Sequence, residues 1–73
     1  MVPLKLMKAG DRVRVMAVTG TDAVRKHLGS LGLIAGAVVA VVQVTDGSMI
    51  VGVHDSRIAI NPDVAARVMV RPE

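Results

Sequence analysis

The sequence contains no Phe, Trp or Tyr, although 52% of its residues are hydrophobic. Its interior must therefore be built almost entirely from Val, Leu, Ile, Ala and Met. Grooves that read proline-rich peptides are lined by aromatic side chains, and single-stranded nucleic acid is usually held by bases stacked on aromatic rings. The missing aromatics exclude both kinds of surface and favour a small aliphatic module that acts by contact with another protein.

Cysteine is also absent, so the chain can form no disulfide and offers no thiolate to a metal ion. Its 73 residues are enough for a single domain, residues 1–73. A domain of this size buries only about 60% of the surface that its unfolded chain exposes. A second copy or a permanent partner would add stability by binding the folded form. Self-association and an independent fold therefore both stay open.

Long charge runs are missing as well. Nine basic residues oppose six acidic ones, which gives a net charge of +3, but they are scattered and form no polybasic tail. This mild basicity favours acidic partners. Because the chain has neither stacking rings nor a charge run, we predict no nucleic-acid partner.

No stretch of the chain is apolar enough to enter a membrane. The N-terminus mixes Lys with short apolar residues, unlike a signal peptide. The longest apolar run, Leu31–Val42, covers 12 residues and is interrupted by Gly32 and Gly36, whereas a membrane span needs about 18 residues. We therefore expect a cytoplasmic protein that is not embedded in a membrane.

Short strands bounded by turn residues dominate what is present. Arg12 and Arg14 alternate with valines, which predicts a half-buried strand whose arginines face solvent. Asp46-Gly47 between two β-rich runs predicts a hairpin with a type I′ turn, and Gly52 in the returning strand predicts a bulge or bend. The expected strands cover residues 12–18, 37–44, 49–53, 58–60 and 68–70. Together they indicate a small β-barrel.

One helix is expected between the first two of these strands, over Asp22–Leu31. Val24, Leu28 and Leu31 recur at the spacing of one helix face. Gly32 suits the position just after the helix end, where the backbone often turns left-handed.

Two further signals concern helix starts. Thr19 and Asp22 have the spacing of a loose capping box. Asn61-Pro62-Asp63 combines an N-cap residue, a proline at the first helical position and an acidic first turn. This second signal predicts a short helical turn from Asp63 to Arg67.

No group of residues indicates catalysis. The serines lack a neighbouring base, and His27 and His54 belong to different predicted elements, where both are expected to be exposed. Metal sites usually need several converging His, Cys or carboxylate ligands, and no such cluster is visible. We predict no enzyme activity, no catalytic or metal-ligating residue and no cofactor, and we leave open weak Fe(II) binding by His27, His54 or Asp55.

The stretch Arg25–Gly36 carries a basic helix, a Leu-Gly-Leu step and a Gly that precedes a strand. In this it resembles the FeoA family, the small ferrous iron transport proteins A. Further matches follow in the same order, with Leu6–Asp11 before the first long strand, Ile58–Ile60 after the second hairpin and Val68–Val70 near the end. The resemblance covers nearly the whole chain. The motif residues, which look mainly structural in the family, are Leu28, Leu31, Gly32, Leu33 and Gly36.

The resemblance implies a mainly β fold, an SH3-like barrel of about five strands with one inserted α-helix and a short C-terminal helical turn. It also implies a non-enzymatic accessory protein of bacterial ferrous iron uptake. Members of the family act with FeoB, a membrane transporter that carries a cytoplasmic GTP-binding domain. We therefore expect docking on the cytoplasmic part of FeoB.

The chain departs from the family pattern at two places. Gly29 stands where relatives usually have a larger apolar residue, and Asp46-Gly47 makes a tighter hairpin than many relatives have. A glycine on the helix admits a close neighbour, so we expect a partner-binding face there. Its residues are Arg25, Lys26, Leu28, Gly29 and Leu31.

Two other functions stay open. The run Val38–Val44 is apolar on both faces of the expected strand, and it could form the interface of a self-associating module. A similar SH3-like domain forms the C-terminal part of some metal-dependent transcription repressors. A metal-sensing module that uses His27, His54 and Asp55 is therefore the other alternative.

Overall fold

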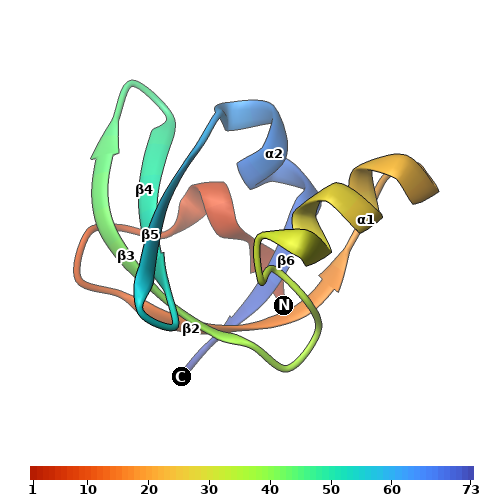
Figure 1. Cartoon of the computed structure of the whole chain (residues 1–73). Coiled ribbons are helices and arrows are strands. Elements are labelled where there is room, and N and C mark those ends of the chain that lie inside the picture. Colours follow the sequence, from red (N-terminus) through yellow and green to blue (C-terminus); the bar gives the residue numbers. More distant parts are fainter.

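Six antiparallel strands in one sheet, two short α-helices and one 3-10 turn make up the computed structural model, which describes residues 1–73 (Figure 1). The strand order across the sheet is β1-β6-β2-β3-β4-β5. The mainly β class with one inserted helix and a short C-terminal helix is thereby confirmed. The elements are β1 (Val2–Pro3), η1 (Leu4–Leu6), β2 (Arg12–Val18), α1 (Asp22–Ser30), β3 (Val38–Thr45), β4 (Ser48–Val53), β5 (Ser56–Ile60), α2 (Pro62–Arg67) and β6 (Val68–Pro72).

The core is aliphatic, as the composition predicted. Fourteen residues are buried, and all of them are apolar. Ten of them occupy the inward-facing positions of strands, because successive side chains of a strand point to opposite faces. In β2, for example, Val13 and Val15 are fully buried, whereas Arg12 at the start of the strand is exposed. The other four are Leu4, Leu28, Leu33 and Ala65. No polar side chain is buried.

Packing rather than strand pairing closes the barrel. The strand order leaves β1 and β5 as the two ends of the sheet, without a hydrogen-bonded pair between them. β1 is only two residues long because the chain turns into η1 directly after Pro3. Helix α2 contacts η1, β1 and β4 at this open side (Figure 1), and its residue Ala65 is fully buried. Helix α2 therefore covers the gap between β1 and β5, where no strand pairing closes the barrel.

The bend of the sheet does not lie at Gly52, so that prediction is wrong. Gly52 stands in regular register with Ala40 on one side and Arg57 on the other. The register shifts occur instead in β2, between Val15 and Ala17, and in β3, between Val41 and Gln43. An extra residue on one strand bends that strand and increases its twist, and these two bulges therefore supply the curvature.

Both central hairpins turn on two residues. Asp46 and Gly47 have φ values of 51° and 85°, which confirms the predicted type I′ turn. The next turn is shorter than expected, because Val53 pairs with Ser56 and only His54 and Asp55 lie between them. His54 has a φ of 54°, a left-handed conformation that glycine usually occupies.

The start of α1 differs from the expected capping box. Thr21, not Thr19, is the N-cap residue, and its hydroxyl accepts a hydrogen bond from the Val24 N–H at 3.2 Å. Thr19 Oγ1 instead donates to the Arg67 carbonyl at 3.1 Å, which ties β2 to the end of α2. The start of α2 follows the prediction, because Asn61 Oδ1 accepts from the Val64 N–H at 2.8 Å.

The end of α1 is a complete Schellman motif, as the position of Gly32 predicted. Gly32 has a φ of 94°. Its N–H donates to the Gly29 carbonyl at 2.9 Å, and the Leu33 N–H donates to the Leu28 carbonyl at 3.0 Å. Leu28 and Leu33 are both buried, which is the apolar contact that accompanies this motif. The motif sets the direction in which the chain leaves α1.

Candidate functional site

Helix α1 extends away from the curled sheet and is largely solvent-exposed (Figure 1). Leu28 is its only buried residue, with 1% of its surface exposed. Val24 is half-buried against the core. The helix is thus held mainly at its C-terminal end, and most of its surface is available for contact with another molecule.

The five residues predicted for the partner-binding face lie at different depths. Arg25 and Lys26 are exposed, Gly29 and Leu31 are half-buried, and Leu28 belongs to the core. Arg25 forms an ion pair with Asp22 one turn earlier in the helix. A partner on this face would meet the two cationic side chains directly, whereas Leu28 would act only by holding the helix in place.

A small apolar hollow lies beside this part of α1. It has a volume of about 240 Å³ and is lined by Val18, Arg25, Leu33, Ile34 and Ala35. Ile34 is 55% exposed, which is unusual for a large aliphatic side chain next to a helix. The hollow gives the cationic helix face an apolar neighbour.

The close neighbour expected at Gly29 is part of the chain itself. A Cβ atom added to Gly29 would lie 3.4 Å from Ile34 Cγ2, which is ordinary van der Waals contact, and the backbone there is not left-handed. An alanine therefore fits at this position. A larger side chain would have to displace Ile34 or extend into the space beside it.

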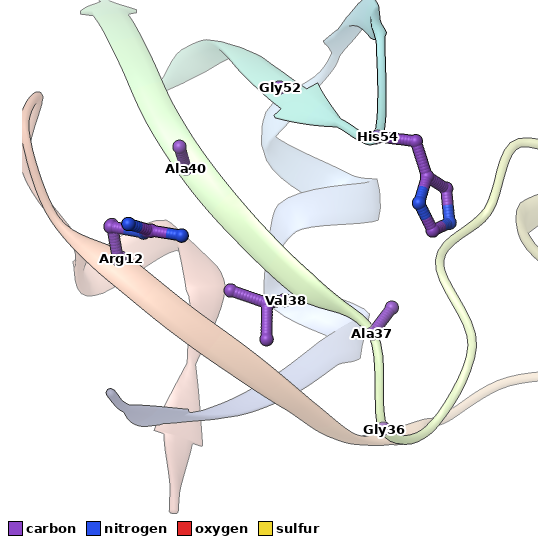
Figure 2. A pocket seen from close by; sticks show the side chains of 7 residues that line it. All are labelled: Arg12, Gly36, Ala37, Val38, Ala40, Gly52 and His54. Carbon is purple, nitrogen blue, oxygen red and sulfur yellow. The ribbon is translucent and has the colours of Figure 1, made fainter.

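A second and larger hollow lies on the outer face of the sheet. Its volume is about 470 Å³, and it is lined by Arg12, Gly36, Ala37, Val38, Ala40, Gly52 and His54. Figure 2 shows Arg12 on one side of strand β3 and His54 on the other, with Ala40 and Val38 between them. No carboxylate lines this hollow.

The arginines of β2 do not behave alike. Arg12 is exposed, as predicted, but Arg14 is half-buried and binds two acceptors. Its Nη1 donates to the Gly36 carbonyl at 2.9 Å, and its Nη2 donates to Glu73 Oε1 at 2.6 Å. This hydrogen bond, helped by the charges of Arg14, Arg71 and Arg12 and opposed by partial desolvation, holds the pKa of the Glu73 carboxyl below its ordinary value.

The residues named for a metal site are separate surface groups. His27, His54 and Asp55 are all exposed. No three His, Cys, Asp or Glu side chains gather closely enough to hold a metal ion. Fe(II) binding by these residues stays a prediction. No helix of the structure has the length and apolar character needed to cross a membrane.

Sequence reasoning missed the outer-face hollow. The sequence patterns predict Arg12 only as part of a solvated strand, Gly52 as a bend and His54 as a turn residue. The two-residue turn at His54 and Asp55 fixes the register of β4 and β5 and so places Gly52 opposite Arg57. The Asp46-Gly47 turn alone would place Val41 opposite Gly52, and only the bulge in β3 brings Ala40 there. The pairing of β2 with β3 is set by no such turn, because a long connection through α1 separates them.

Comparison with known proteins identifies relatives over nearly the whole chain. The family model of the FeoA domain matches residues 2–72. A crystal structure of an iron uptake regulatory protein (FeoA) is 39% identical, covers 99% of this chain and 96% of its own, and superposes with a TM-score of 0.90. The solution structure of the FeoA protein from Chlorobium tepidum is 29% identical, covers 97% of this chain and 70% of its own, and has a TM-score of 0.87.

The fold also occurs within longer proteins. The crystal structure of IdeR from T. acidophilum is 26% identical, with a TM-score of 0.89, and the match covers 99% of this chain but 34% of that one. The SH3-like fold expected for this chain is thereby confirmed. A comparison with curated protein sequences gave no match.

Proposed function

Because the chain belongs to the FeoA family, we propose that it is a non-enzymatic accessory protein of bacterial ferrous iron uptake that docks on the cytoplasmic part of the FeoB transporter. Family membership supports a role in ferrous iron transport. The observation that carries the proposal is the family match over residues 2–72, together with a solved FeoA structure that is 39% identical.

The exposed side of α1 is the docking face that we favour. Arg25 and Lys26 present two positive charges to solvent, and the apolar hollow at Leu33 and Ile34 lies next to Arg25. Specific interfaces commonly combine an apolar centre with a charged rim. The hydrogen bonds of the Schellman motif and the buried Leu28 and Leu33 hold the C-terminal end of the helix on the core.

Charge reversal on α1 tests the docking face. We expect the double variant Arg25→Glu/Lys26→Glu to weaken binding to the purified cytoplasmic domain of FeoB by about tenfold or more, because both charges border the contact. Lys5→Glu, at an exposed position of η1, is the control and should bind as the wild type does. Isothermal titration calorimetry measures both affinities, and circular dichroism checks the fold.

Gly29 provides a second, uncharged test on the same helix. Gly29→Ala should retain Fe(II) uptake in a complementation assay, because an alanine meets only Ile34 at 3.4 Å. Gly29→Leu should reduce uptake while the protein stays folded, because its longer side chain alters the surface beside Ile34. Equal uptake by both variants would remove Gly29 from the docking face.

Binding to FeoB and the location of the docking face on α1 are tested separately. A wild-type protein that binds neither purified FeoB nor membranes containing it would contradict the function. Wild-type binding that survives charge reversal of Arg25 and Lys26 would move the docking face elsewhere and leave the function in place.

Self-association is the second candidate, favoured by one observation. Val42 and Val44 at the end of β3 are both partly exposed, although they are large aliphatic residues. Burying them between two copies would remove apolar surface from water. Sedimentation at micromolar concentration tests this candidate, and a strict monomer would exclude it.

A further inference from the structure

We propose that the outer face of the sheet binds an acidic, extended segment of a protein partner, which crosses β2, β3, β4 and β5 along the row formed by Arg12, Ala40, Gly52 and Arg57. This site goes beyond the proposed function. None of its residues belongs to α1, and it does not depend on whether FeoB is the partner at the helix.

The strand register builds the row. Arg12 lies opposite Ala40, Ala40 opposite Gly52, and Gly52 opposite Arg57. Residues directly opposite each other in an antiparallel pair project from the same face of the sheet. The adjacent row contains Val13, Val39 and Val53, which are buried. The row of Arg12 therefore faces outward, with an arginine at each end and no side chain larger than a methyl group between them.

The centre of the row is the floor of the larger hollow. Ala40 and Gly52 both line its 470 Å³, and Arg12 and His54 stand at its borders (Figure 2). Because Ala40 and Gly52 have short or no side chains, the backbone of a second chain can approach the sheet closely here. The lining contains hydrogen-bond donors at Arg12 and His54 but no carboxylate.

Neither arginine at the ends of the row forms an ion pair, although the Glu73 carboxylate that is bound to Arg14 also interacts with the charge of Arg12. The ion pairs of the chain are Arg14 with Glu73 and Arg25 with Asp22. Arg12 and Arg57 are exposed and take part in neither. An arginine pairs well with a carboxylate because its planar guanidinium matches the geometry of the two oxygens.

The same face already holds one carboxylate. Arg14 lies two positions after Arg12 in β2, and it donates to Glu73 Oε1 at 2.6 Å. This internal pair shows that an arginine of β2 on the outer face can bind a carboxylate. A partner carboxylate on Arg12 would repeat the arrangement one pleat away.

The distance between the two arginines sets the spacing of the acidic residues. Three strand spacings separate β2 from β5, or about 14 Å. In an extended segment, side chains four residues apart lie on one face at about 13 Å. The row therefore fits acidic residues at positions i and i+4, with a small residue at i+2 above Ala40 and Gly52. Nucleic acid fits less well, because the face has no aromatic ring on which bases could stack.

A synthetic peptide tests this arrangement. The probe is acetyl-Gly-Glu-Ala-Gly-Ala-Glu-Gly-amide, and its control has glutamine in place of both glutamates. We expect the acidic peptide to shift the ¹⁵N–¹H signals of Arg12, Ala40, Gly52 and Arg57 in NMR spectra, more strongly at low salt. The glutamine peptide should leave these signals unchanged.

Two variants locate the site without disturbing the core. Gly52→Val fills the hollow, and its Cβ would have no neighbour closer than 3.9 Å. Arg12→Gln/Arg57→Gln removes the charges at both ends. Each variant should lower the affinity for the acidic peptide by about tenfold or more. A dispersed NMR spectrum should show that the fold is intact. Lys26→Gln, a charge loss on α1, is the control and should bind the peptide normally.

Several outcomes would overturn the site. These are an absence of shifts with the acidic peptide, equal binding of the glutamine peptide, shifts that map to α1, and unchanged binding by Gly52→Val. Displacement of the peptide by an oligothymidylate of higher affinity would assign the face to nucleic acid instead. None of these results bears on FeoB binding, which the helix variants measure separately.

Discussion

At the scale of single residues, the charges of the outer sheet face are set by individual contacts. Arg14 is half-buried and shares its donors between Gly36 and Glu73, whereas Arg12 two positions earlier is exposed and forms no ion pair. The strict alternation in β2 is the same for both residues. β6 pairs Arg14 with Arg71, and the Glu73 N–H just after β6 donates to the Arg12 carbonyl at 2.9 Å. The two arginines differ because the Glu73 side chain reaches across to Arg14.

Removing the Arg14 guanidinium should release the Glu73 carboxyl. We expect the pKa of Glu73 to lie below the usual glutamate range in the wild type and to rise in Arg14→Gln, because the hydrogen bond from Arg14 is the largest cause of its depression. Arg12→Gln should raise it less, because Arg12 acts only through its charge and is the weakest cause. Carboxyl ¹³C shifts followed against pH measure both changes.

The sign of the linked stability effect follows from the lowered pKa. A carboxyl with a lower pKa in the folded state stabilises the fold above its unfolded pKa, and this contribution is lost as the pH falls through the folded value. As the pH falls through the acidic range, the free energy of unfolding should therefore decrease more in the wild type than in Arg14→Gln. Identical acid unfolding curves would show that the pair does not contribute to folding.

At the scale of elements, the end of α1 requires glycine at position 32 for two independent reasons, its left-handed backbone and its contact with β4. Gly32 has a φ of 94° in the Schellman motif. A Cβ at this position would also lie 2.7 Å from Val53 Cγ1, so the helix end packs directly on β4. The nearby Gly36 has the same φ of 94° but no atom within 4 Å of an added Cβ.

This pair separates backbone strain from steric overlap. Gly36→Ala should cost about 1–2 kcal/mol of stability, the expected penalty of a left-handed backbone for alanine. Gly32→Ala should cost about 1–3 kcal/mol more, because the extra methyl group overpacks the contact with Val53. Urea unfolding of both variants gives the two values. Equal losses would mean that Val53 moves aside without cost.

At the scale of the whole molecule, the fold is closed by side-chain packing at the ends of the sheet. The unpaired strands β1 and β5 would leave the core open if η1 and α2 did not cover it. Leu4 of η1 is fully buried in this core, with 0% exposed, whereas Leu6 in the same turn is 59% exposed. Leu4 therefore belongs to the core, whereas Leu6 in the same turn faces solvent.

Truncating these leucines tests the closure. Leu4→Ala should lower the free energy of unfolding by about 2–5 kcal/mol, because it leaves a cavity where η1 meets the core. Leu6→Ala should change it by less than about 0.5 kcal/mol, because that side chain lies in solvent. Thermal and urea unfolding measure both effects. A similar loss in the two variants would mean that η1 does not close the barrel.

Local signals in the sequence were sufficient for most of the elements. The alternation of Arg12 and Arg14 with valines, the Asp46-Gly47 turn and the Asn61 cap each depend on contacts within a few residues. The Leu28–Gly32 segment likewise fixed the end of α1. The family resemblance then added the SH3-like arrangement of these elements, which no single pattern specified.

Tertiary structure alone decided where distant segments meet. The chain ahead of α1 offers Thr19 and Thr21 as caps, and only the contact with Arg67 assigns Thr19 to another role. The register shifts lie near Met16 and Val42, and Gly52 stays in regular pairing, although the sequence marks Gly52 and neither of the other two as a break. The alignment of Arg12 with Arg57 likewise depends on the register of four strands. Sequence patterns report local backbone preference, whereas register and closure depend on the packing of the complete core.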